Sequence, residues 1–219
     1  MISNPPVPAL SDRLADAFAV VLNLHRDQTR KVRPIPYIAH LMSVAALVLE
    51  DGGSEDEAIA ALLHDAIEDQ GGVPTRAKLL QRFGPQVIAI VDVCTEPPRQ
   101  PDQSWRDHKL AYLRQVAQAP EVAQRVVLAD KLHNVRSLLE NLALQGDVIW
   151  SRFAATPEDY LWLYRSLTDL FDRALPGHLT TQLKAAVTQL SQRVQPAQNS
   201  GPVRLDTICL KTARSDKNC

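Results

Sequence analysis

The chain is organised around residues 60–69, which read Ala-Ala-Leu-Leu-His-Asp-Ala-Ile-Glu-Asp. An apolar run opens the stretch, and residues that bind metals or move protons close it. On a helix that turns by about 100° per residue, His64 and Glu68 fall on one stripe, and Asp65 and Asp69 fall on the adjacent one. The apolar start gives this helix no reason to be fully solvated. We therefore expect the polar cluster to line a cleft.

The composition is that of an ordinary globular protein. The chain has 219 residues, 45% of them apolar and 22% charged, and its formal net charge is -1. This length is enough for one large domain with a full core. So small a net charge gives no general attraction to a nucleic-acid polymer or to an acidic membrane, and we expect neither partner. No run of residues is long and apolar enough to predict a membrane span.

Cysteine usage and the N-terminal sequence indicate the compartment. Cys94, Cys209 and Cys219 form no CxxC pair, which fits a reducing cytoplasm and excludes a zinc site built from thiolates. Residues 1–10 are rich in proline and lack the basic start and apolar run of a signal peptide. We therefore expect a cytoplasmic protein.

The sequence pattern is helical along most of the chain. Only 8 glycines are present, aromatic residues make up 5%, and apolar residues recur with the spacing of a helix face. This pattern predicts an all-α fold with helices over residues 11–25, 37–50, 54–70, 75–83, 86–95, 104–118, 120–144, 157–175 and 179–194. Ser11, Ser54, Thr75 and Thr156 are the expected N-caps, and Glu57 completes a capping box with Ser54.

The same pattern predicts one helical domain over residues 11–194. Residues 1–10 form an N-terminal extension, and residues 195–219, where Pro, Asn, Ser and Gly interrupt the pattern, form a flexible C-terminal tail. The apolar stripes of the last two helices either complete the core or form the face of a homodimer. Both alternatives remain open at this point.

A His-Asp pair needs ligands from other segments before it can hold a metal ion. His40 lies among apolar neighbours early on its helix, so its ring should face inward. Asp130 follows four apolar residues and should be buried, and a buried carboxylate requires a partner. Imidazole and carboxylate together suit Mn²⁺, Fe²⁺, Zn²⁺, Co²⁺ or Mg²⁺. His40, His64, Asp65 and Asp130 would therefore form a metal site with positions left for water and substrate.

The order of these residues resembles the HD-domain superfamily of metal-dependent phosphohydrolases. The closest likeness is to RelA/SpoT-type hydrolase domains and their small stand-alone relatives. The segments that carry the resemblance are QTRK (28–31), PYIAH (36–40), LLHDAIED (62–69), FG (83–84) and LADKLHN (128–134). A lone HD dipeptide would carry no weight, but these segments keep their order and gaps across about residues 14–140.

The resemblance implies a single-domain HD fold with one divalent metal ion, usually Mn²⁺. The implied reaction removes pyrophosphate from the 3′ position of guanosine tetra- or pentaphosphate. The implied metal ligands are His40, His64, Asp65 and Asp130. The resemblance further implies that Glu68 and Asp69 activate the water and handle the proton of the leaving oxygen, and that Arg30, Lys31 and Asn134 contact the nucleotide.

Other interpretations stay open because the chain departs from its relatives in places. Residues 32–35 lack the glycine that usually precedes Pro-Tyr, and residues 96–98 are not basic. Three kinds of substrate therefore stay open: guanosine tetraphosphate, another nucleotide or another phosphate ester. The competing hypothesis for the function is a nucleotide-binding regulatory module without catalytic activity. Arg30 and Lys31 also fit a solvated basic loop. Asn134 also fits a hydrogen bond to a metal ligand.

Overall fold

The computed structural model describes residues 10–194, and regular structure in that range is helical. The helices are α1 (Asp12–Leu24), α2 (Ile38–Glu50), α3 (Glu55–Leu63), α4 (Ala66–Asp69), α5 (Gly72–Phe83), α6 (Pro85–Cys94), α7 (Trp105–Ala117), α8 (Glu121–Gln145), the 3₁₀ helix η1 (Gly146–Arg152), α9 (Pro157–Ala174) and α10 (His178–Arg193). The all-α prediction is confirmed. The predicted tail and nearly all of the predicted extension lie outside the described residues.

The helix starts follow the capping residues of the sequence. The Ser11 side chain accepts a hydrogen bond from the backbone of Arg13 at the start of α1. Ser54 and Glu57 form a complete capping box at the start of α3. Such caps satisfy backbone N–H groups that have no partner within the helix. They therefore fix where the helices that carry the site begin.

Outside the segment around His64 and Asp65, two helix boundaries differ from the prediction. Helix α5 begins at Gly72, and Thr75 does not cap it, since the Thr75 hydroxyl donates to the carbonyl of Gln70. Gly71 has a φ of 109°, a left-handed conformation that glycine adopts without strain, so the chain turns early enough for α5 to start there. The predicted break after residue 144 is a 3₁₀ helix, η1.

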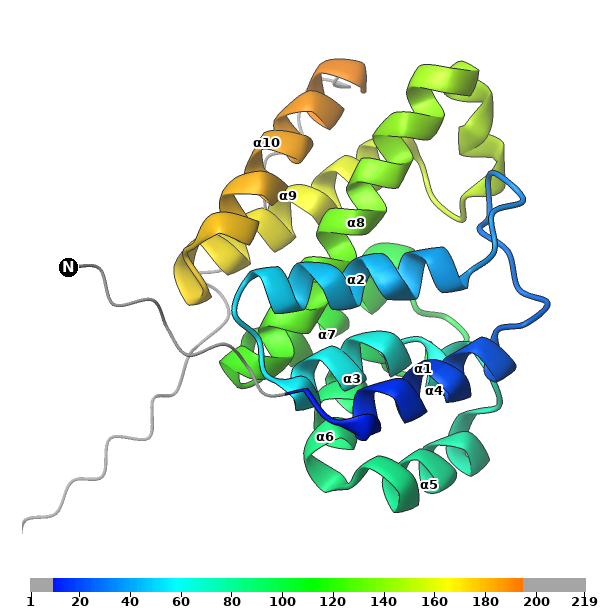
Figure 1. Cartoon of the computed structure of the whole chain (residues 1–219). Coiled ribbons are helices and arrows are strands. Elements are labelled where there is room, and N and C mark those ends of the chain that lie inside the picture. Colours follow the sequence, from blue (N-terminus) through cyan, green and yellow to red (C-terminus); the bar gives the residue numbers. More distant parts are fainter. Residues whose placement is uncertain (1–9, 195–219) are drawn as a thin grey trace, which may run out of the picture.

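Helix α8 is the central element of the fold. It packs against α2, α3, α6, α7, α9, α10 and η1, and Figure 1 shows it running through the middle of the molecule. Leu128, Ala129 and Leu132 are fully enclosed, which accounts for the apolar residues before and after Asp130. A polar residue on this helix is therefore held by packing on several sides.

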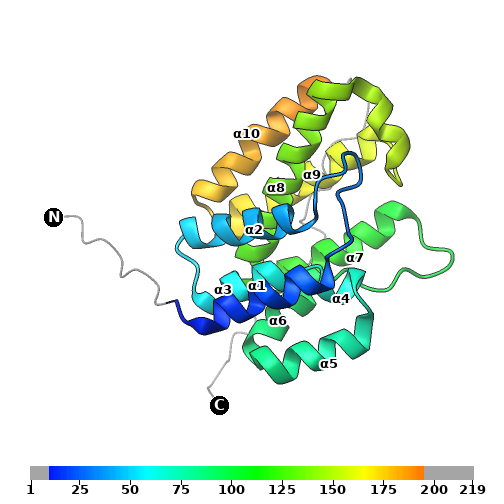
Figure 2. The same ribbon diagram turned by 45° about the vertical axis from the view of Figure 1, so that its right-hand side comes forward.

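The loop between α1 and α2, residues 25–37, stands beside η1 and the C-terminal end of α8 in both views (Figures 1 and 2). Arg33 forms an ion pair of 2.7 Å with Glu140 of α8. The guanidinium of Arg152 donates to the carbonyl of Lys31 at 3.5 Å. These contacts hold the basic loop against α8, the helix that carries Asp130, and against η1.

The last two helices complete the core of this chain. Leu167, Phe171, Leu183 and Leu190 are fully enclosed, and α9 and α10 pack on each other and on α8. Their apolar stripes are therefore covered within one copy. None of the helices in the described range has the length and apolar character needed to cross a bilayer.

Candidate metal centre and substrate pocket

The HD dipeptide lies at a break between two helices. Helix α3 ends at Leu63 and α4 begins at Ala66, so His64 and Asp65 stand between them. The prediction of one continuous helix through residues 54–70 is wrong at this point. Neighbouring side chains on a regular helix diverge by about 100°, and the break allows both side chains to approach one point.

Four side chains meet at that break. The Nε2 atom of His64 lies 3.0 Å from Asp65 Oδ2 and 3.5 Å from Asp130 Oδ1. The Nε2 atom of His40 lies 3.6 Å and 3.2 Å from the same two oxygens. Ligands about 2.1 Å from a common metal ion are separated by about 3.0 to 3.4 Å in octahedral or tetrahedral geometry. The spacing of these atoms is therefore that of a ligand set.

Both histidines present Nε2 toward the carboxylates because Nδ1 is engaged elsewhere. His64 Nδ1 lies 2.8 Å from the carbonyl of Ala61, to which only an N–H can donate. His40 Nδ1 lies 2.7 Å from Nδ1 of His133. Burial, together with His40 and Arg30, lowers the pKa of His133 to about 4, so His133 is neutral and can accept. A hydrogen bond at one ring nitrogen fixes the tautomer that leaves the other free to bind a metal.

The donor set fits a divalent cation. His40 Nε2 and His64 Nε2 are buried, and neither has a hydrogen-bond partner among the described residues. His40, His64 and Asp65 bring ligand atoms within 4.8 Å of one another. Burial opposes a charge on His64, yet the Asp65 and Asp130 carboxylates raise its pKa well above the usual value. The position therefore favours positive charge, as a metal site must.

Further groups hold the carboxylates in place. The Tyr37 hydroxyl donates to Asp65 Oδ2 at 2.6 Å. Asp130 pairs through Oδ2 with Lys131 at 2.8 Å, and its Oδ1 accepts from Asn134 Nδ2 at 2.5 Å. Asn134 in turn accepts from Arg30 at 2.6 Å. The interpretation of Asn134 as a hydrogen-bond partner of Asp130 agrees with this geometry.

The two acidic residues of α4 face different neighbours. Glu68 Oε2 accepts from the backbone N–H of Glu96 at 3.2 Å, and Asp69 Oδ2 accepts from Gln28 at 2.7 Å. Loss of surrounding water, together with the charges of Glu96 and Asp65, raises the pKa of Glu68. Both side chains keep an exposed edge. They can therefore meet a water or a substrate at the mouth of the site.

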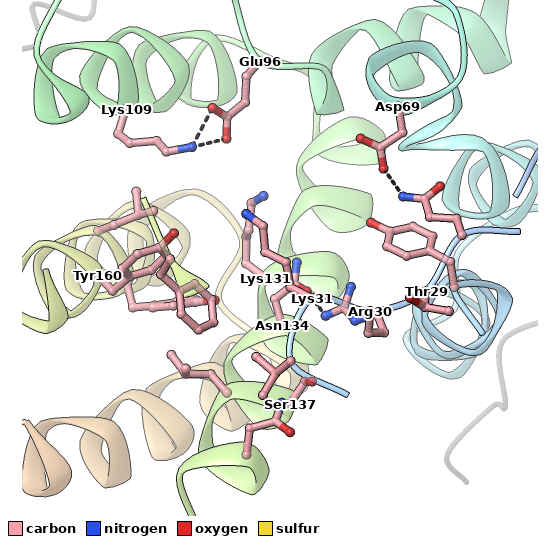
Figure 3. A pocket seen from close by; sticks show the side chains of 18 of the residues that line it. Thr29, Arg30, Lys31, Asp69, Glu96, Lys109, Lys131, Asn134, Ser137 and Tyr160 are labelled. Carbon is pink, nitrogen blue, oxygen red and sulfur yellow. Dashed lines mark hydrogen bonds and ion pairs between the residues drawn. The ribbon is translucent and has the colours of Figure 1, made fainter. Parts of the chain in front are cut away.

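A pocket of about 360 Å³ adjoins this cluster. Its lining includes Asp69 and three residues bonded to the candidate ligands, namely Tyr37, Lys131 and Asn134. In Figure 3, Lys131, Asn134 and Ser137 follow one another along α8, with Tyr160 on one side and Arg30 on the other. The pocket thus extends from the metal centre along α8.

The charge of the pocket is mainly positive. The predicted substrate residues Arg30, Lys31 and Asn134 all line it, as do Lys109 and Lys131. Glu96 forms an ion pair with Lys109 at 2.5 Å (Figure 3). The guanidinium of Arg30 lies 5.5 Å from the centroid of the Tyr37 ring, close enough for a cation–π contact that holds it at the pocket wall. The basic loop is therefore part of a concave site.

Comparison with known proteins decides the family. A family model described as HD domain matches residues 17–159, a range that contains the candidate ligands, Glu68, Asp69 and the basic loop. The chain belongs to the HD-domain family. The resemblance to RelA/SpoT-type domains is also confirmed, since the relatives named below are of that type.

Two relatives and one solved structure illustrate the likeness. Human guanosine-3′,5′-bis(diphosphate) 3′-pyrophosphohydrolase MESH1 is 37% identical over 133 residues, which are 58% of this chain and 69% of that protein. A probable guanosine-3′,5′-bis(diphosphate) 3′-pyrophosphohydrolase of Synechocystis is 35% identical over 125 residues, 56% of this chain but 16% of that protein. The HD chain therefore spans a small part of the cyanobacterial protein.

The solved structure concerns a metazoan ortholog of SpoT that hydrolyses ppGpp. It matches with a TM-score of 0.67 at 24% identity and covers 83% of this chain and 97% of that chain. At this identity the match establishes the fold. The predicted HD-domain helical fold is confirmed.

Several pocket residues of this HD domain carry no signal in the sequence. Lys109, Tyr112, Asn141 and Tyr160 line the pocket from α7, α8 and α9. Lys109, Tyr112 and Tyr160 reach it only because α7 and α9 pack on α8, a tertiary contact that helical periodicity does not predict. Lys131 could have been found from its place next to Asp130, because a buried carboxylate calls for a cation nearby.

Proposed function

We propose that this HD-domain chain is a metal-dependent phosphohydrolase that removes the 3′-pyrophosphate of guanosine tetra- and pentaphosphate. Two features support it: the four-residue donor set and the cationic pocket that starts beside it. The names of the human and Synechocystis relatives supply the nucleotide and the reaction. The observation that carries the proposal is the pair of buried, unpartnered histidine nitrogens that face two carboxylates at 3.0 to 3.6 Å.

The proposed metal ligands are His40, His64, Asp65 and Asp130, and the proposed ion is Mn²⁺. Nitrogen and carboxylate oxygen donors suit this ion, and they also suit Zn²⁺, Fe²⁺, Co²⁺ and Mg²⁺. When bound, a divalent ion lowers the pKa of a coordinated water and neutralises phosphoryl oxygens. Elemental analysis of protein purified without chelator, followed by titration with each ion, identifies the metal.

The residues of the chain supply the rest of the mechanism. The water oxygen forms a bond to the phosphorus attached to the 3′ oxygen of the ribose, and the bond from that phosphorus to the 3′ oxygen breaks. The Glu68 carboxylate accepts a proton from the attacking water, and its raised pKa suits it to this role. Asp69 relays this proton from Glu68 to the leaving 3′ oxygen, so that neither carboxylate keeps it after the reaction. The products are pyrophosphate and a guanosine with a free 3′-hydroxyl, which is the 5′-diphosphate from the tetraphosphate and the 5′-triphosphate from the pentaphosphate.

The pocket holds the nucleotide for this reaction. Lys131 and Lys31 place positive charge where the phosphates lie. Arg30 presents the flat face of its guanidinium, which suits stacking on a base. Asn134 holds the side chains of Arg30 and Asp130 in place, because it forms a hydrogen bond with each of them.

A panel of nucleotides tests the proposal. The protein is incubated with Mn²⁺ and guanosine tetraphosphate, guanosine pentaphosphate, a reduced dinucleotide phosphate or simple nucleoside monophosphates, and the released phosphate is identified. The proposal requires pyrophosphate from the guanosine 3′-pyrophosphates, lost in His64→Ala and kept in His178→Ala, an exposed histidine of α10. Orthophosphate from the monophosphates or the dinucleotide would instead favour another phosphate-ester substrate. Nucleotide binding without turnover would favour a regulatory module.

A further inference from the structure

Two buried polar groups in the pocket have no hydrogen-bond partner. Within the described part of the chain, Tyr112 Oη and Asn141 Oδ1 are enclosed and unpaired. Tyr112 is 1% exposed and Asn141 is 5% exposed. Both residues line the pocket beside the metal centre. The proposed mechanism uses neither of them.

An unpaired buried polar group destabilises a fold, because it has lost its bonds to water and gained none in exchange. Such groups are few in native proteins, and each calls for an explanation. Replacing them with apolar groups of the same shape removes this destabilisation. When two of them line one pocket, a bound ligand that supplies the missing partners explains both.

Tyr112 lies at the end of the pocket nearest the metal centre. The Lys131 ammonium is 5.2 Å from the centroid of its ring, and Lys131 is paired with Asp130. Lys109 precedes Tyr112 by about one turn of α7, so the two side chains share a face. A buried phenol hydroxyl whose ring lies against the Lys131 ammonium is suited to donate to a phosphate oxygen.

Asn141 lies at the far end. Asp130, Asn134, Ser137 and Asn141 follow one another on α8 at spacings of four, three and four residues, which places them on one stripe. At about 1.5 Å per residue, the stretch from Asp130 to Asn141 is about 16 Å long. This length suits a nucleotide whose phosphates lie at the metal centre.

Asn141 shares the pocket with apolar and aromatic residues. Leu138, Phe153, Leu163 and Tyr164 line the pocket together with it. Flat apolar walls with one polar group between them suit a nucleobase. The unpaired atom of Asn141 is an acceptor, and the edge of guanine carries adjacent N–H donors.

We propose that Tyr112 and Asn141 contact the substrate at the two ends of the pocket. The Tyr112 hydroxyl donates to an oxygen of the 3′-pyrophosphate, and the Asn141 amide oxygen accepts from the N–H edge of guanine. This inference rests on the proposed function and adds to it the residues that recognise each end of the nucleotide. Tyr112 is then a catalytic residue, and Asn141 determines specificity for the base.

The variants Tyr112→Phe and Asn141→Leu test this inference, because each removes the polar group and keeps most of the shape. We expect the melting temperature of the metal-free protein to stay equal or rise. We expect kcat/KM for guanosine tetraphosphate to fall by about tenfold to a hundredfold in each variant. In Asn141→Leu the loss should lie in KM, and the preference for guanosine over adenosine tetraphosphate should fall about tenfold. Asn23→Leu, on the exposed face of α1, is the matched control and should change neither value.

Binding is measured separately, by calorimetry of guanosine tetraphosphate with Mn²⁺-loaded Glu68→Gln protein, in which turnover is slowed. If the wild type does not cleave this nucleotide but the Glu68→Gln protein binds it, and Asn141→Leu weakens the binding at least tenfold, the proposed function and the catalytic role of Tyr112 fail, and the inference for Asn141 stands. If the wild type cleaves it and both variants keep KM, kcat and affinity within twofold, the inference fails and the function stands. A drop of several degrees in melting temperature in either variant would indicate a structural role and overturn the inference for that residue.

Discussion

Tyr37 holds a candidate metal ligand through one hydrogen bond, and its removal should weaken metal binding. The Tyr37 hydroxyl donates to Asp65 Oδ2 at 2.6 Å. A hydrogen bond to a charged group contributes about 1.5 to 3 kcal/mol. Tyr37→Phe should therefore weaken Mn²⁺ binding by about tenfold to a hundredfold, because each tenfold change corresponds to about 1.4 kcal/mol.

The substitution Tyr37→Phe removes only the hydroxyl and keeps the aromatic ring. The ring stacks on His25 at 5.3 Å and supports Arg30, and phenylalanine can keep both contacts. Isothermal titration of metal-free protein with Mn²⁺ gives the affinity, and Tyr160→Phe is the control, since Tyr160 lines the pocket without a bond to a candidate ligand. An unchanged affinity in Tyr37→Phe, or an equal loss in the control, would refute the reasoning.

The remaining predictions concern single groups. The kcat of the wild type should fall as the pH is lowered through the raised pKa of Glu68, which lies above 4.5, the ordinary pKa of a glutamate, because Glu68 must be ionised to act as a base. The Glu68→Gln variant should lose most of the activity, and a pH series should show that its remaining kcat no longer falls in this range. His64→Ala should abolish turnover, whereas Lys31→Met should mainly raise KM in steady-state assays, because Lys31 is exposed. Arg125→Leu should lower the free energy of unfolding in urea by about 3 kcal/mol, because the buried Glu57, 3% exposed, loses its ion pair with Arg125. Adding Glu57→Gln removes the unpaired charge and should restore part of the lost free energy of unfolding. A double variant as unstable as Arg125→Leu alone would contradict this account.

The sequence predicted the parts of the site that depend on local order. His40 and Asp130 were expected to face inward from their apolar neighbours, and both are buried. The capping box of Ser54 and Glu57 was read from spacing alone and is present. These predictions succeed because caps and helix faces depend on residues within one or two turns. The roles of the site residues in metal binding and catalysis remain proposals.

The parts that failed depend on tertiary contacts or on local backbone geometry. Helical periodicity does not predict the break between α3 and α4 at His64 and Asp65, since the residues on either side are good helix formers. The sequence predicts Thr75 as the N-cap of its helix, but the left-handed conformation of Gly71 lets α5 begin at Gly72, before Thr75. The contribution of Tyr112 to the pocket follows from the packing of α7 on α8, which no pattern within either helix encodes.

The most direct test of the metal centre is a crystal structure of the protein soaked in Mn²⁺, with anomalous scattering used to locate the ion. The account predicts one strong peak, bonded to Nε2 of His40, Nε2 of His64 and one oxygen each of Asp65 and Asp130, at about 2.0 to 2.3 Å. The absence of a peak at saturating Mn²⁺, or a peak that leaves either histidine unbound, would contradict the central claim.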